Sequence, residues 1–278
     1  MNRVSTLQVV NIAAYIVTIV VNFLAQSASV LGIEAFPTTV AALGESRAIF
    51  FLPAGYVFAI WGVIYLGLAA FVIYLGRPAQ RANPATARIG WWFALSCAGN
   101  VVWLVLFLNN QVAASTIAML VILVSLLAIY LRLDIGRAAV SSAERWAVHI
   151  PFSIYLGWIT VATVANIAAT LYEAGSVTAF LAIGADVWAA LMMLVAALLA
   201  VAMIFTRGDV AFPLVVVWAL VGIYVRPFDT EVFAPLAGLN AGLVDTSALA
   251  LAVLIVVALV AYLLLRRQRA VEPTRRTA

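Results

Sequence analysis

Long runs of apolar residues, separated by short polar segments, follow one another along the whole chain. A helix needs about 20 mostly apolar residues to cross the hydrocarbon core of a bilayer. The seventh run is the shortest, although its Pro213 suits the first turn of a helix. Eight runs are of this kind: Leu7–Val30, Ala54–Gly76, Arg88–Leu108, Val112–Leu133, Trp146–Tyr172, Asp186–Phe205, Ala211–Val225 and Ser247–Leu265. The pattern therefore predicts an all-α, polytopic transmembrane helix bundle with about eight spans.

Composition agrees with this prediction and excludes several other classes. Of the 278 residues, 67% are hydrophobic and 9% are charged, whereas soluble proteins average about 25% charged residues. A soluble globular domain or a disordered chain is therefore excluded. Cys97 is the single cysteine and His149 the single histidine, which excludes an intramolecular disulfide and multi-cysteine or multi-histidine metal sites. The chain has no lysine, which excludes Schiff-base and P-loop chemistry.

Arginine is distributed unevenly between the two sides that eight spans define. With the N-terminus in the cytoplasm, 13 of the 15 arginines lie inside, and Arg47 and Arg226 lie outside. Because basic residues favour the cytoplasmic side, both chain ends are predicted to be cytoplasmic. The inside arginines are Arg3, Arg77, Arg81, Arg88, Arg132, Arg137, Arg145, Arg207, Arg266, Arg267, Arg269, Arg275 and Arg276. This topology accounts for the net charge of +4 without a nucleic-acid partner. Arginine used in place of lysine is typical of a GC-rich bacterium, whose inner membrane is the expected location.

The segments around the spans carry three further expectations. The first run is longer than the apolar segment of a signal peptide, so an uncleaved helix is expected. The two longest connections, Leu31–Pro53 and Arg226–Thr246, fall outside, where the first is either a lid or a passive surface loop. The chain divides into a core at 1–175, three further transmembrane helices at 176–265 and a basic cytoplasmic tail at 266–278.

Three predicted helices carry aromatic and polar residues on one face. The spacing of these residues matches helical periodicity, and all three faces fall in the outer half of the membrane. Such faces pack helices together in many membrane proteins, and they also line pockets for flat hydrophobic ligands, so both interpretations stay open. The residues are Phe58, Trp61 and Tyr65 on the second helix, Asn100, Trp103 and Phe107 on the third, and Tyr155, Trp158 and Asn166 on the fifth.

Ionisable residues offer little catalytic chemistry. His149 is expected near the cytoplasmic end of the fifth helix as an interfacial, hydrogen-bonded residue, with a proton relay or an axial haem ligand as alternatives. Asp186 is expected to cap the sixth helix. No mid-span carboxylate, paired acids or Ser/His/Asp grouping is predicted, and no metal or catalytic residue is assigned. The sequence therefore does not favour an enzyme.

At these residues the chain resembles the translocator protein / peripheral benzodiazepine receptor family (TspO/MBR, the tryptophan-rich sensory proteins). The stretch Pro53-Ala-Gly-Tyr-Val-Phe-Ala-Ile-Trp61-Gly-Val-Ile-Tyr65 is similar to the second-helix motif of that family. Asn100-Val-Val-Trp103 with Phe107, and Trp158 followed by Asn166, are similar to its third-helix and fifth-helix motifs. The resemblance covers roughly residues 7–172.

The chain also departs from the pattern of the family. Tyr56 stands at the first tryptophan position of the second-helix motif, and Val105 and Ile154 stand where the family has proline. Glu173 follows Tyr172 where a basic residue would close a sterol motif, so sterol recognition by that route is not expected. The last three predicted helices have no counterpart in a five-helix family.

The resemblance implies a five-helix bundle whose pocket, open toward the first loop, binds porphyrins, haem or synthetic aromatic ligands. By this carry-over, all nine residues of the three faces lie on the pocket wall. The implied function is a membrane receptor or sensor for a flat hydrophobic ligand, with no cofactor required and porphyrin or haem as the ligand. A transporter or exporter of small hydrophobic molecules and a porphyrin-degrading membrane enzyme are the alternatives. The small ligand and membrane lipid are the expected partners, and the oligomeric state is left open.

Overall fold

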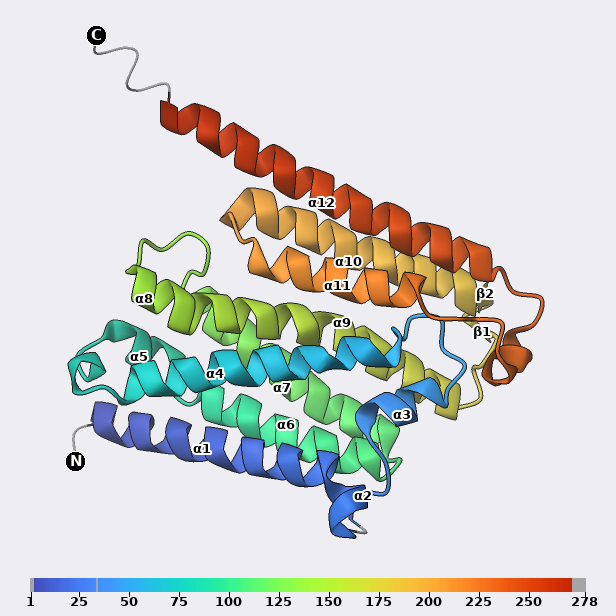
Figure 1. Ribbon diagram of the computed structural model, residues 1–278, viewed down its shortest axis with the longest axis horizontal. Helices are drawn as coiled ribbons and strands as arrows, with labels where there is room; N and C mark the ends of the chain where they lie inside the picture. Colours follow the sequence, from blue (N-terminus) through green and yellow to red (C-terminus); the bar gives the residue numbers. More distant parts are fainter. Residues whose placement is uncertain (1–2, 34, 272–278) are drawn as a thin grey trace.

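The structure is a computed structural model that describes residues 3–33 and 35–271, and its long helices lie side by side in one bundle (Figure 1). Helix α1 begins and α12 ends at the same end of the bundle, where α5 and α8 also lie. We call this the arginine-rich end, because Arg81, Arg145 and Arg207 lie there. The opposite end, which carries α2, α3 and the two short strands, is called the lid end (Figure 1). The elements in chain order are α1 (Arg3–Gln26), α2 (Ala28–Leu31), α3 (Val40–Glu45), η1 (Gly55–Ala59), α4 (Ile60–Gly76), η2 (Pro78–Gln80), α5 (Pro84–Ile89), α6 (Trp92–Leu108), α7 (Val112–Arg132), α8 (Ser142–Glu144), η3 (Arg145–His149), α9 (Ile150–Glu173), β1 (Ala179–Phe180), β2 (Ile183–Gly184), α10 (Ala185–Arg207), α11 (Ala211–Tyr224), η4 (Glu231–Leu236) and α12 (Ala241–Val271).

Each of the eight predicted spans corresponds to a long helix, which confirms the all-α polytopic bundle. Six spans, those built on α1, α4, α7, α9, α10 and α12, are at least 18 residues long and apolar enough to cross a membrane. Helices α6 and α11 are shorter, at 17 and 14 residues, and pack between their longer neighbours. Length and hydropathy of the apolar runs therefore predicted the number and order of the eight longest helices.

The bounds of the third and the last spanning helix differ from the predicted ones. The third span begins at Trp92, four residues later than expected, because Gly90 has φ +55° and separates α5 from α6. Helix α12 begins earlier, at Ala241, and continues to Val271, so the first part of the predicted tail is helical. Arg275 and Arg276 of that tail lie outside the described residues.

Helix α9 lies at the centre of the bundle. It packs against α7 and α4 on one side and against α11 on the other, while α11 in turn packs against α10 and α12. Phe71 of α4, Phe93 of α6 and Phe152 of α9 form a buried triangle of rings, with centroids 4.9, 4.9 and 5.8 Å apart. Large buried rings of this kind contribute strongly to packing between helices. The division of the chain near residue 175 into a core and three further helices stays a prediction.

A turn of π-helix precedes α9. Residues Arg145–His149 form this wider turn, two residues before Pro151. Proline has no N–H to donate to the preceding turn, which explains why the regular hydrogen-bond ladder is interrupted there. The π turn places Arg145 and His149 along one side of the bundle at the arginine-rich end.

Candidate functional site

Four aromatic rings form a continuous stack in the half of the bundle toward the lid end. Trp61 of α4 stacks on Tyr65 with centroids 5.5 Å apart and on Trp103 of α6 at 5.7 Å. Trp103 stacks in turn on Phe107 at 5.5 Å. The interplanar angles lie between 22° and 29°, so the four rings are nearly parallel. The predicted faces of the second and third helices therefore meet each other directly.

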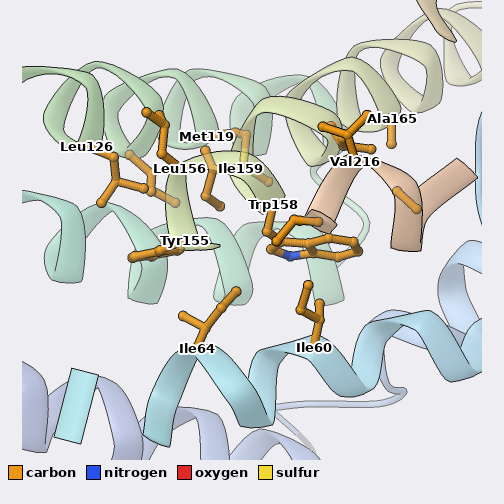
Figure 2. Packing of buried hydrophobic residues seen from close by; sticks show 14 of the residues in the cluster. Ile60, Ile64, Met119, Leu126, Tyr155, Leu156, Trp158, Ile159, Ala165 and Val216 are labelled. Carbon is orange, nitrogen blue, oxygen red and sulfur yellow. The ribbon is translucent and has the colours of Figure 1, made fainter. Parts of the chain in front are cut away.

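The fifth-helix aromatic residues pack with their edges against this stack. Trp158 lies 6.3 Å from Trp61 at 83°, and Tyr155 lies 6.0 Å from Trp61 at 68°. Phe58 completes the group, 5.8 Å from Trp158 at 87°. Figure 2 shows Tyr155 and Trp158 pointing from α9 toward α4. Each such pair contributes about 0.5–1.5 kcal/mol beyond the area that it buries.

Two amide side chains connect this aromatic cluster to other helices. The side chain of Asn22 of α1 accepts a hydrogen bond from the Tyr65 hydroxyl at 2.7 Å. It also donates to the side-chain amide oxygen of Asn100 at 2.9 Å. Asn166 of α9 accepts the Trp103 indole N–H at 2.9 Å and donates to Thr116 of α7 at 2.6 Å. These bonds fix the orientation of Tyr65 and Trp103 within the stack.

Two buried hydrogen-bond donors of the cluster have no acceptor among the described residues. They are the indole N–H of Trp158 and the amide NH₂ of Asn100, whose side chains are 2% and 0% exposed. An unsatisfied buried donor costs about 1–3 kcal/mol. Native proteins rarely keep such groups without a water molecule or a ligand as partner. The two donors therefore mark positions where a bound group would gain hydrogen bonds.

A cavity of about 40 Å³ lies against the cluster. Its wall includes Phe58, Trp61, Trp103, Phe107, Trp158 and Asn166. Tyr65, Asn100 and Tyr155 are not part of this wall. They support it through ring contacts and the Asn22 network described above. Pockets for small organic ligands measure about 300–1,000 Å³, so the cavity is closed around far less space than a porphyrin needs.

The segment Val40–Pro53 covers this cavity, and we call it the lid. The lid contributes Gly44, Arg47 and Leu52 to the wall of the cavity. Arg47 is 4% exposed, and its guanidinium lies 5.6 Å from the Phe107 ring centroid, at the end of the aromatic stack. It donates to Glu173 at the end of α9 at 2.8 Å and to the Asn110 side chain at 2.6 Å. Arg47 thus holds the lid to two helix ends of the core.

Arg226, two residues after the end of α11, also holds the lid, and we call it the lid clamp. Its guanidinium donates to four lid carbonyls, those of Ile49 at 3.2 Å, Leu52 at 3.0 Å, Arg47 at 3.1 Å and Gly44 at 3.4 Å. Burial lowers the pKa of Arg226 to about 10, with Glu45 opposing that shift, so the side chain stays charged at neutral pH. The two arginines predicted to lie outside are therefore both buried, and both hold the lid.

Comparison with known proteins agrees with this architecture. The model of the TSPO-like protein family matches residues 8–265 of the chain. The chain belongs to the TSPO-like protein family. No curated protein and no solved structure shows a significant match. The match to the TSPO-like family continues past residue 172, where the motif resemblance ends, and takes in α10, α11 and α12.

Three contributors to the site of this TSPO-like chain were not predicted. Asn22 is a polar residue inside the first apolar run, and Arg47 and Arg226 are the two exceptions to the arginine distribution. A polar residue within an apolar run, or a charge on the unexpected side, was the available signal in each case. Their partners lie too far away in sequence to be identified from spacing.

A second polar cluster lies toward the arginine-rich end and was also missed. Asp209, 6% exposed, accepts hydrogen bonds from the hydroxyls of Tyr130 at 2.7 Å and Ser153 at 2.5 Å. It also accepts the backbone N–H of Ala211 at 2.9 Å, at the start of α11. His149 lies in the same region, but no hydrogen bond of its side chain occurs within the described ranges. Ser153 donates to a carboxylate and not to an imidazole, so the cluster is a structural anchor and not a nucleophilic triad.

Proposed function

We propose that this TSPO-like protein is a membrane receptor or sensor that binds a flat hydrophobic ligand of the porphyrin or haem type in its aromatic cluster. The nine predicted residues Phe58, Trp61, Tyr65, Asn100, Trp103, Phe107, Tyr155, Trp158 and Asn166 form the binding region of this proposal. Six of them line the cavity beneath the lid and the other three support its wall. No cofactor is needed for such binding.

The unpartnered indole N–H of Trp158 is the observation that carries this proposal. Packing alone explains an aromatic stack, but it does not explain a buried donor in a cavity wall with no acceptor. A ligand with polar groups at the edge of a flat ring system would accept this hydrogen bond while its face stacks on the indoles. The stack and the donor together favour such a ligand over an aliphatic one.

Ligand entry in this proposal requires the lid to move. A cavity of about 40 Å³ does not admit a porphyrin, so the described conformation is one in which the lid is closed. The lid is held by side-chain hydrogen bonds of Arg47 and Arg226 to carboxylate, amide and backbone oxygens, all of which can break and re-form. Binding would then select a conformation in which the lid is displaced.

The test is a titration of the purified protein in detergent with haemin and with protoporphyrin, followed by the absorbance of the porphyrin. Wild type is expected to bind saturably, and Trp158→Phe to bind about tenfold more weakly, since it loses one hydrogen bond of about 1.4 kcal/mol. Asn100→Ala is expected to weaken binding indirectly, because it removes the acceptor of the Asn22 bond that supports the cavity wall. Trp146→Phe is the control, because Trp146 is 70% exposed and lies at the arginine-rich end. Equal affinity in all four proteins would mean that the cluster serves packing alone.

The same preparation distinguishes a receptor from the other functions that the sequence leaves open. Reconstituted into proteoliposomes, a receptor binds the porphyrin without moving it across the bilayer, whereas an exporter produces net flux. An enzyme would convert the porphyrin to a product whose formation depends on Trp61 or Trp158. Binding without flux or product is the expected result.

We also propose that the protein lies in a bacterial inner membrane with both ends in the cytoplasm. The ends of α1 and α12 that lie together at the arginine-rich end support this orientation (Figure 1). Fusion of a fluorescent protein or of alkaline phosphatase to the C-terminus tests it, because the first is active in the cytoplasm and the second in the periplasm. Phosphatase activity would contradict the proposed orientation.

A further inference from the structure

A large groove lies outside the site described above. It measures about 810 Å³ and runs between α4 and α11, with α9 as its floor. Ile60 and Val63 of α4 form one wall, Leu214 and Trp218 of α11 form the other, and Ile150 and Ile154 form the floor. The groove exceeds the cavity beneath the lid many times over, and none of the nine predicted ligand-binding residues lines it.

The groove is open sideways toward the surrounding membrane. Val63, Leu214 and Trp218 line it and are all exposed. Trp218 is held in place by a hydrogen bond from its indole N–H to the carbonyl of Val57 at 3.0 Å and by an edge contact with Tyr56 at 5.4 Å. In a bilayer this opening faces acyl chains, so an apolar chain enters it without crossing a polar barrier.

The two ends of the groove differ in chemistry. At the arginine-rich end, Arg145 and Arg266 line it, and neither makes a salt bridge within the part of the chain that the structure describes. At the other end the lining is apolar. A basic end joined to an apolar trough between helices matches an anionic headgroup followed by an acyl chain.

Acidic groups near this end do not oppose an anion. Asp209 lines the groove, but its carboxylate is buried and is occupied by the Tyr130 and Ser153 hydroxyls and by backbone N–H groups. Asp134 is paired with Arg207 at 3.1 Å. Glu144 accepts a long hydrogen bond from Asn83 at 3.4 Å, away from the groove lining. The unpaired charge at the groove end is therefore positive.

The floor of the groove matches the depth of one leaflet of a bilayer. From Arg145 to Ile154 the floor helix advances about 13 Å, at ~1.5 Å per residue. The hydrocarbon depth of one leaflet is about 15 Å, half of a ~30 Å core. A molecule with its head at Arg145 and Arg266 thus places its apolar part alongside the chains of the same leaflet.

We propose that this groove binds one anionic glycerophospholipid from the surrounding bilayer. Its phosphate lies at the end formed by Arg145 and Arg266, and one acyl chain lies between α4 and α11. The bound lipid thus fills the space between the core helix α4 and the C-terminal helix α11. This proposal is independent of whether the aromatic cluster binds a porphyrin.

The test uses native mass spectrometry of the full chain released from nanodiscs made of equal parts phosphatidylglycerol and phosphatidylethanolamine. Wild type is expected to retain one phosphatidylglycerol per chain, with at least tenfold preference over phosphatidylethanolamine. Arg145→Gln with Arg266→Gln is expected to abolish this preference. The control, Arg81→Gln with Arg88→Gln, removes the same charge from exposed positions outside the groove lining and is expected to keep it.

A third variant tests the apolar part of the groove. Leu214→Trp fills the trough from an exposed position and is expected to lower lipid retention at least tenfold with both arginines in place. Unchanged retention in this variant would overturn the proposal, because the lipid would then be held at the surface by charge alone. Equal loss in the groove and control arginine pairs would overturn it as well, and so would equal retention of the two lipids by wild type.

Discussion

Replacement of Arg226 by methionine is predicted to release the lid while leaving the rest of the bundle folded. Methionine keeps an unbranched apolar side chain but removes all the donors that hold the lid carbonyls of Gly44, Arg47, Ile49 and Leu52. The helix α11 that precedes Arg226 keeps its packing against α9 and α12. The change therefore acts on the closed state of the lid and not on the helices.

The size of the effect follows from the bonds that are lost. Hydrogen bonds to a charged group contribute about 1.5–3 kcal/mol each, but the burial of the guanidinium offsets a large part of the four. Water reaches lid carbonyls once the lid loosens, which lowers the cost further. We expect a net loss of about 3 kcal/mol in the free energy of lid opening, which corresponds to about 100-fold at 1.4 kcal/mol per factor of ten.

Hydrogen–deuterium exchange of peptides that cover residues 44–54 measures this opening. The amide of Ala54, where the lid joins η1, donates to the Gly222 carbonyl of α11 at 3.0 Å, so its exchange requires release of the lid from α11 and reports the free energy of that opening. Exchange about 100-fold faster than in wild type is the expected result for Arg226→Met. Arg207→Met is the matched control, since Arg207 pairs with Asp134 at the opposite end. Unchanged exchange of these peptides in Arg226→Met would show that Arg226 does not hold the lid closed.

Three further predictions test contacts around the site. Gly222→Ala is expected to lower the Tm by several degrees, because the added Cβ would lie 2.2 Å from Val57, whereas Gly62→Ala, with nothing within 4 Å, leaves it unchanged; equal Tm values in the two would contradict this. Glu173→Gln removes the salt bridge of Arg47 but keeps a side-chain oxygen that accepts from it. Because Glu173 is 39% exposed, calorimetry is expected to find a loss below about 1 kcal/mol, and a larger loss would contradict the expected solvent screening of the Glu173 charge. Asp209→Asn is expected to cost about 2–3 kcal/mol in urea unfolding, since it weakens two buried hydroxyl bonds, and a cost no larger than that of an exposed aspartate would contradict the anchor role.

Helices and aromatic faces were predictable from the sequence because both depend on local spacing. Apolar runs of about 20 residues determine where a chain crosses a membrane, and turns at residues such as Gly90 only shift the ends. Phe58, Trp61 and Tyr65 share a face through helical periodicity alone. Once the helices pack, the faces that carry tryptophan turn inward, and the stack of Trp61 on Trp103 follows.

The lid clamp and the Asp209 anchor were not predictable in the same way. Arg226 and the Gly44 carbonyl are 182 positions apart, and only the three-dimensional path of α11 brings them together. Asp209 lies in a short connection between α10 and α11 and looks like an ordinary loop residue until Tyr130 and Ser153 converge on it. The distribution of charges along a chain indicates on which side of the membrane each loop lies, but it does not indicate which charged side chains become buried.

The position of α11 gives the three C-terminal helices a part in the site itself. Its carbonyl at Gly222 accepts the Ala54 N–H at 3.0 Å, at the point where the lid joins η1, and Arg226 then binds the lid carbonyls. The Trp218 indole binds the carbonyl of Val57 in the same η1 turn. A core made of only the first five spans would lack all of these bonds. Such a core would need other groups to hold the lid in place. Helix α11 and Arg226 therefore hold the lid in its closed position, and changes at this end of α11 are expected to loosen the lid before they alter the aromatic cluster.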